Sequence, residues 1–183
     1  MKYSDVAALM QSGDMIEFDS NAILGRLIKF FTGKKRTHTA GIEGTMGQTQ
    51  NFLIEANAPG IELETAIRDF STTGSKIYWT PLLRKYDGNR KAIADFWLSQ
   101  VGCPYNYQGL FSNILGHINA TVGKYICSIF YFVGLVEGAI FPNYSVKCNE
   151  VVDLSGKAVP GPRPGEMTER FPEIFGDTVE IVL

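Results

Sequence analysis

The sequence has few cysteines and few histidines, and this scarcity excludes several kinds of protein. The 183 residues include three cysteines, Cys103, Cys127 and Cys148, an odd number without a close pair. This argues against a disulfide framework and suits a reducing compartment. The two histidines, His38 and His117, lie far apart, and neither C-x-x-C nor H-x-x-x-H spacing occurs. We therefore expect no structural metal site.

An excess of charge of one sign is also lacking. The formal net charge is -2, from 17 basic and 19 acidic residues. One basic cluster, residues 34–36, is only three residues long. A solvated loop explains this cluster better than a nucleic-acid-binding surface, so we expect no nucleic-acid partner.

Long uninterrupted apolar runs are missing as well. Residues 1–14 lack the apolar core of a signal peptide, which predicts a cytoplasmic protein unless a leader has been removed. The longest apolar stretch, residues 125–141, contains Gly134, Glu137 and Gly138 and is shorter than the about 20 residues of a membrane span. It predicts a buried helix and no transmembrane segment.

What the chain does have is enough apolar sequence for one sizeable core. Hydrophobic residues make up 45% and aromatic residues 12% of its length. We expect a single domain over residues 1–183. The sequence does not indicate its oligomeric state.

Hydrophobic periodicity predicts a mixture of strands and helices. The expected strands are 15–19, 37–45, 51–57, 75–83 and 177–183, with 37–45 and 51–57 forming a hairpin. The expected helices are 21–33, ended by Gly33, then 89–102, and one that begins near Cys127. In the second helix one face carries Ile93, Phe96, Trp97 and Val101. Residues 62–70 are predicted as a short helix or turn, and residues 104–123 as a loop with an irregular helix.

Cys127 stands at the start of an apolar, aromatic run, in the stretch GKYICSIFYF. In the first turn of a helix, unpaired backbone N–H groups and the helix dipole favour a thiolate. This is the setting of a nucleophile. The alternative is a small hydrophobic residue of the core.

A thiol nucleophile needs a base and a group that orients the base. His38 opens a strand-like run, whereas His117 lies among apolar residues and is better explained as structural. Glu55 follows three apolar residues on the neighbouring strand of the hairpin, where burying it requires a partner. If His38 and Glu55 meet on one face, Glu55 fixes the tautomer of the imidazole. A solvent-facing Glu55 at a strand end is an equally good interpretation of the spacing.

The order of GDMIEF, RTHTAGI, FLIEAN, GCPYNYQGL and YICS resembles the circularly permuted branch of the NlpC-like papain-fold cysteine peptidases. That branch includes YiiX-type bacterial proteins and is related to lecithin:retinol acyltransferase. Its histidine precedes its cysteine, as His38 precedes Cys127 here. The resemblance covers roughly residues 12 to 140, judged by pattern. It implies an α+β, permuted papain-like fold, with an antiparallel sheet packed against helices and the nucleophile at a helix N-terminus.

The resemblance also implies roles for particular residues. Cys127 would be the nucleophile, His38 the base and Glu55 the orienting group. Tyr105 would line the substrate cleft or help to polarise the substrate carbonyl. Family members often place an acidic residue after Cys-Ser, whereas this chain has Ile129. This difference affects the expected substrate more than the nucleophile.

The implied activity is a cysteine peptidase or amidase that acts on a peptide, a cell-wall peptide or another acyl-containing substrate, without metal or organic cofactor. An alternative is acyl transfer or hydrolysis on a lipid with the same three residues. Four phenylalanines could line an acyl groove, although core positions explain them better: Phe30, Phe31, Phe130 and Phe132. A second alternative is a binding module of the same fold with an idle site.

Overall fold

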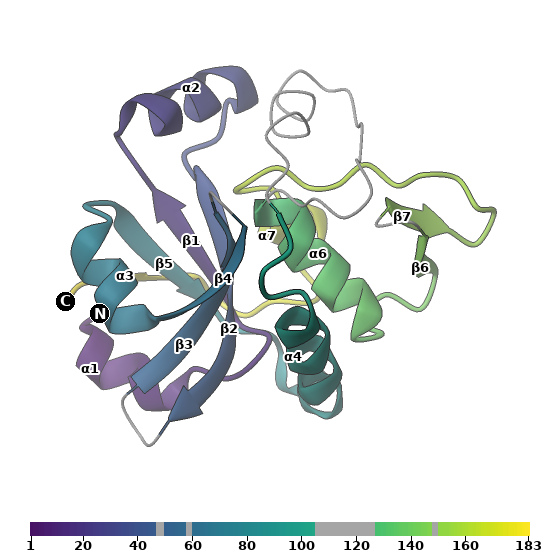
Figure 1. Cartoon of the computed structure of the whole chain (residues 1–183), viewed down its shortest axis with the longest axis horizontal. Coiled ribbons are helices and arrows are strands. Elements are labelled where there is room, and N and C mark those ends of the chain that lie inside the picture. Colours follow the sequence, from purple (N-terminus) through teal and green to yellow (C-terminus); the bar gives the residue numbers. More distant parts are fainter. Residues whose placement is uncertain (47–49, 58–59, 105–126, 148–149) are drawn as a thin grey trace.

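A six-stranded antiparallel sheet forms the centre of the protein in a computed structural model (Figure 1). The structure describes residues 1–46, 50–57, 60–104, 127–147 and 150–183. In spatial order the strands are β4 (Ile61–Thr65), β3 (Gln50–Ala56), β2 (His38–Met46), β1 (Met15–Asp19), β5 (Lys76–Thr80) and β8 (Val179–Ile181). With helices on both faces, this confirms the predicted α+β class and the hairpin of β2 and β3.

Helices cover both faces of the sheet. One face is covered by α1 (Tyr3–Val6), the 3₁₀ turn η1 (Ala7–Leu9) and α3 (Ala66–Thr72) (Figure 1). The other face is covered by α4 (Arg90–Ser99) and α6 (Cys127–Glu137), and the 3₁₀ turn η2 (Arg84–Asn89) precedes α4. The remaining elements are α2 (Ile23–Thr32), a hairpin of β6 (Tyr144–Lys147) and β7 (Glu150–Asp153), and α7 (Met167–Arg170). The predicted helix over 125–141 is confirmed for Cys127–Glu137, whereas residues 138–141 are described and lie beyond its end. The helix is buried nearly all round, as an apolar helix must be.

Each central strand contributes to two hydrophobic clusters, one on each face of the sheet. Along β1, Met15 belongs to the cluster under α4 and α6, whereas Ile16 belongs to the cluster under α1 and α3. On β3, Ile54 and Leu53 divide between the clusters in the same way. Since neighbouring side chains point to opposite faces, a sheet covered on both sides needs apolar residues at consecutive positions.

Trp97 of α4 fixes how closely α6 approaches the sheet. Its fully buried ring lies against Gly41 of β2 and Gly134 of α6, and a Cβ atom on either glycine would overlap the indole. Packing at this density leaves no room for a methyl group. The two glycines therefore let α6, and the cysteine at its start, lie next to β2.

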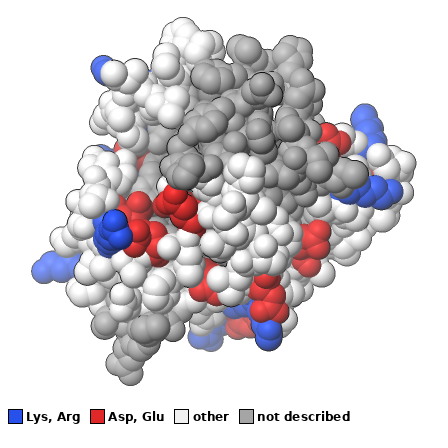
Figure 2. Space-filling model, in the orientation of Figure 1, with Lys and Arg blue, Asp and Glu red and all other residues white. Residues whose placement is uncertain are grey.

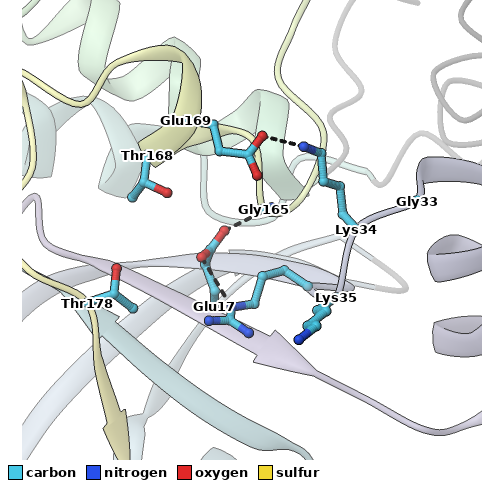
Figure 3. Close-up of a pocket in the computed structure, with 9 residues that line it drawn as sticks. Glu17, Gly33, Lys34, Lys35, Gly165, Thr168, Glu169 and Thr178 are labelled. Atoms are coloured by element: carbon cyan, nitrogen blue, oxygen red, sulfur yellow. Dashed lines mark hydrogen bonds and ion pairs between the residues drawn. The ribbon is translucent and has the colours of Figure 1, made fainter.

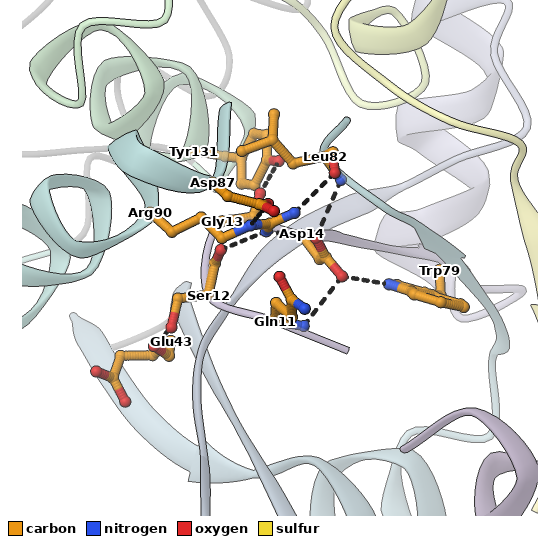
Figure 4. Close-up of polar contacts among 10 residues, drawn as sticks. All are labelled: Gln11, Ser12, Gly13, Asp14, Glu43, Trp79, Leu82, Asp87, Arg90 and Tyr131. Carbon is orange, nitrogen blue, oxygen red and sulfur yellow. Dashed lines mark hydrogen bonds and ion pairs between the residues drawn. The ribbon is translucent and has the colours of Figure 1, made fainter. Parts of the chain in front are cut away.

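A buried polar cluster around Asp14 connects strands of the sheet with helix α4 (Figure 4). Its carboxylate accepts hydrogen bonds from the N–H groups of Gln11 and Leu82, the indole of Trp79 and the guanidinium of Arg90, over 2.8–3.1 Å. Burial nevertheless raises the pKa of Asp14, against the opposing effect of Arg90. The cluster joins the start of β1 to the end of β5 and to α4.

The structure corrects two predictions made from the sequence. Residues 61–65 form the edge strand β4, and only Ala66–Thr72 is helical, because Ile61, Leu63 and Thr65 alternate with glutamates in a period of two. In α4, Ile93 and Trp97 are fully buried and Phe96 is partly buried as expected, but Val101 lies beyond the helix and is exposed.

Candidate active site

His38 and Glu55 meet on one face of the sheet. His38 is the first residue of β2, and Glu55 of β3 pairs with Ala40, two residues further along, so their side chains are diagonal neighbours. Nε2 of His38 lies 2.6 Å from Oε2 of Glu55. The imidazole is 21% exposed and the carboxylate 4%. Glu55 is therefore buried and paired, and the alternative of a solvent-facing Glu55 is wrong.

Cys127 reaches the same imidazole from the helical layer. It is the first residue of α6 and is buried. Its thiol and the His38 side chain influence each other's pKa, and the backbone N–H groups of Thr39 and Ser128 also act on the thiol. Because Nε2 of His38 contacts Glu55, Nδ1 is the ring nitrogen left for the thiol. The structure thus brings together Cys127, His38 and Glu55, from α6, β2 and β3.

The electrostatics of this group favour an ion pair between cysteine and histidine. Burial alone would raise the pKa of the Cys127 thiol, but the adjacent imidazolium and the backbone N–H donors lower it below its ordinary value. Burial alone would lower the pKa of His38, but the Cys127 thiolate and the Glu55 carboxylate raise it well above its ordinary value. Each charge is therefore stabilised by the other.

The loop before His38 is fastened to the sheet through Arg36. The guanidinium of Arg36 lies 3.3 Å from the centre of the Tyr78 ring and forms an ion pair with Glu17, which also accepts a hydrogen bond from Gly165. These contacts hold the chain that enters β2, and so position His38.

A cavity of about 380 Å³ lies beside this loop (Figure 3). Its lining includes Glu17 and Glu169, which already pair with Arg36 and Lys34, respectively. Its charges are thus largely neutralised within the protein, and Cys127 and His38 do not line it.

Asp69 is a residue of the site that sequence reasoning missed. It lies on α3 and lines a cavity of about 140 Å³ together with His38 and Glu55. Its Oδ2 atom is buried without a hydrogen-bond partner among the described residues. Burial and the Glu55 charge raise the pKa of Asp69 to about 6. No periodicity in the sequence marks this aspartate, since its place depends on how α3 docks on the sheet.

Three residues discussed from the sequence lie outside the described residues: Tyr105, His117 and Cys148. Of the four phenylalanines, Phe130 and Phe132 are core residues as expected, whereas Phe30 and Phe31 are exposed.

The fold matches that of the solved structure of metalloprotein YiiX from Escherichia coli O157:H7, of the group DUF1105. The TM-score is 0.58 with 14% sequence identity, over 74% of this chain and 70% of that chain. This chain therefore has the fold of YiiX, a permuted NlpC/papain-like fold, as the order of its sequence motifs predicted. No protein-family model and no curated protein sequence matches the chain.

YiiX is described as a metalloprotein, which raises the question of a metal site here. Within the described ranges, no group of three or more His, Cys, Asp and Glu side chains is placed to hold a metal ion. In the same ranges, no helix has the length and apolar character that a membrane span requires.

Proposed function

We propose that this protein is a thiol hydrolase that cleaves an amide bond of a peptide or cell-wall peptide, with Cys127 as nucleophile, His38 as base and Glu55 as orienting group. The observation that carries the proposal is the position of His38: its Nε2 lies 2.6 Å from the Glu55 carboxylate, and its charge lowers the pKa of the Cys127 thiol at the start of α6. This is the arrangement of nucleophile, base and orienter that thiol catalysis requires.

In the first half of the reaction, Sγ of Cys127 attacks the carbonyl carbon as a thiolate, and the carbonyl oxygen takes the electron pair. His38, as imidazolium, gives its Nδ1 proton to the leaving nitrogen as the C–N bond breaks. An amine leaves and a thioester remains on Cys127. Glu55 accepts the hydrogen bond from Nε2, which stabilises the imidazolium and holds the ring in place.

In the second half, the neutral imidazole takes a proton from water, and the hydroxide attacks the thioester carbonyl. The acid product leaves, and the Cys127 thiolate and His38 imidazolium are restored. Backbone N–H groups at the start of α6 are the donors for the oxyanion, and each good donor contributes about 3 kcal/mol. Thr39 and Ser128 also carry buried hydroxyls without a hydrogen-bond partner among the described residues.

A second candidate is hydrolysis or transfer of a lipid acyl group through the same thioester. One observation favours it: α2, which leads into the loop before His38, exposes bulky apolar side chains. The attacking and protonating atoms are the same for an ester as for an amide, so the chemistry of Cys127 and His38 does not separate the two candidates.

The test offers short peptides, cell-wall peptides and phospholipid acyl donors in parallel to the wild-type chain and to Cys127→Ala. We expect product from a peptide donor, independent of detergent or vesicles, and none from the variant. His38→Ala should abolish turnover, while His117→Ala should leave it intact. Product from lipid donors alone would replace the first candidate by the second. Unaltered turnover in Cys127→Ala would overturn both.

A further inference from the structure

Helix α2 presents its apolar side chains to solvent instead of to the core. Phe30 is 79% and Ile23 73% exposed, and three more of its bulky apolar residues are about half exposed: Leu24, Leu27 and Phe31. We name these five side chains the α2 ridge. In the space-filling view, the atoms at the position of α2 are mostly those of uncharged residues (Figure 2).

The orientation of the helix explains this exposure. The side of α2 that faces the protein is made by Gly25, Ile28 and Thr32, the three buried residues of the helix. Gly25 lies against the backbone of Ser20, where a Cβ atom would be too close. The ridge residues follow one another at helical spacing on the remaining surface. A surface helix ordinarily turns its apolar stripe towards the core, and α2 does the reverse.

The segment that carries the ridge contains basic residues and no acidic ones. Between residues 20 and 42 the sequence has five lysines and arginines and no aspartate or glutamate. Three of these cations pair with carboxylates elsewhere in the fold, Lys29, Lys34 and Arg36. Arg26 and Lys35 are exposed and have no carboxylate partner within the described residues. The surface around α2 is therefore suited to an anionic partner.

We propose that α2 docks the protein on the surface of an anionic lipid bilayer. The helix would lie in the plane of the interface, with the α2 ridge among the acyl chains and Arg26 and Lys35 at the level of the headgroups. Interfacial helices combine these features: a bulky apolar face that includes aromatic residues, and a basic rim. A fluid bilayer interface can take up the protruding α2 ridge without having a groove of matching shape. An exposed apolar patch of this kind on a protein surface marks an interaction site.

A second copy of the chain fits this surface less well than a bilayer. In a symmetric contact, the same patch lies on both sides of the interface. Two α2 helices packed through their ridges would bring Arg26 and Lys35 of both copies together, and the segment from 20 to 42 supplies no carboxylate to offset the repulsion.

The experiment measures sedimentation of the full chain with vesicles of phosphatidylcholine containing phosphatidylglycerol, and with vesicles of phosphatidylcholine alone. The protein carries Cys127→Ala, so that binding does not depend on catalysis and the result is independent of the proposed function. We expect the protein to bind to the anionic vesicles. This binding should weaken in high salt, and binding to vesicles of phosphatidylcholine alone should be weaker. The double variant Ile23→Gln, Phe30→Gln should reduce the partition coefficient about tenfold or more, and Arg26→Gln with Lys35→Gln should remove the preference for anionic vesicles.

Matched controls are Ile67→Gln on α3 and Leu154→Gln after β7, since both side chains are exposed and apolar but lie outside α2. These variants should bind like the parent, and all variants should keep its melting temperature, because the altered side chains are at the surface. No binding to anionic vesicles, or an equal loss in the control variants, would overturn the proposal. A dimer that only the α2 variants dissociate, without vesicle binding by the parent, would assign the ridge to a second copy and would equally overturn it.

Discussion

Replacing Asp69 by asparagine should stabilise the protein at neutral pH. The pKa of this carboxyl is raised from 3.8 to about 6 by burial and by the charge of Glu55. A group whose pKa is higher in the folded than in the unfolded state favours folding at low pH, and this contribution is lost as pH rises through the folded pKa. For Asp69 the loss falls between pH 3.8 and about 6. At pH 7 the ionised carboxylate therefore destabilises the fold.

The size of the effect follows from the raised pKa. One pKa unit corresponds to about 1.4 kcal/mol, so the full change would amount to about 3 kcal/mol. Because Asp69 is partly exposed, solvent screening reduces this to about 1.5 kcal/mol. Asparagine also loses a favourable negative charge in the first turn of α3, which costs about 0.5 kcal/mol. The expected gain at pH 7 is therefore about 1 kcal/mol.

Urea unfolding of the wild type and of Asp69→Asn at pH 7 and pH 4 measures this gain. We expect the gain at pH 7 and little or no gain at pH 4, where the wild-type carboxyl is protonated in the folded state. Asp177→Asn, at an exposed position, is the matched control and should change stability little at either pH. Equal effects of Asp69→Asn at both pH values, or destabilisation at pH 7, would refute the reasoning. An aspartate that costs stability beside His38 and Glu55 is best explained by a role in the site.

Three further changes test the site and its support. Cys127 should be alkylated at mildly acidic pH, where ordinary thiols are protonated, and mass spectrometry assigns the label. In His38→Ala, the pH profile of Cys127 alkylation should move towards that of an ordinary thiol. An unchanged profile would make Cys127 a core residue. Asp14→Ala should destabilise the protein by about 3–5 kcal/mol in urea unfolding, because buried donors lose their acceptor. Gly134→Ala should cost about 1–3 kcal/mol or more by overpacking against Trp97; a cost below about 0.5 kcal/mol would contradict the close contact.

The elements that carry Cys127, His38 and Glu55 were predictable from the sequence because each has a strong local pattern. β2 and β3 combine apolar runs with a polar turn, and the long apolar run after Cys127 admits only a buried helix. The spacing left a buried and a solvent-facing Glu55 equally plausible, and in the structure Glu55 is buried with His38 as its partner.

Features that depend on how elements pack were not predictable in the same way. Helical spacing shows that α2 has an apolar face, but not that this face points to solvent, since the direction depends on which residues contact the sheet. Asp69 reaches the site only because α3 lies against β3, and Asp14 gains its partners from β5 and α4. For β4 the alternating signal was present in residues 61–65, but we predicted a short helix or turn over residues 62–70.

The contacts around His38 predict that membrane docking and thiol chemistry are separable. α2 ends at Thr32, Gly33 turns the chain with a φ of 67°, and Arg36 then fixes the loop on Tyr78 and Glu17 before β2 begins. The geometry of His38 therefore depends on these contacts and not on the exposed side chains of α2. Phe30→Gln should leave the rate and the pH profile of Cys127 alkylation unchanged, while it weakens binding to anionic vesicles. If alkylation of Cys127 changed as much as vesicle binding, α2 would be a structural support of the site, and its exposed face would need another explanation.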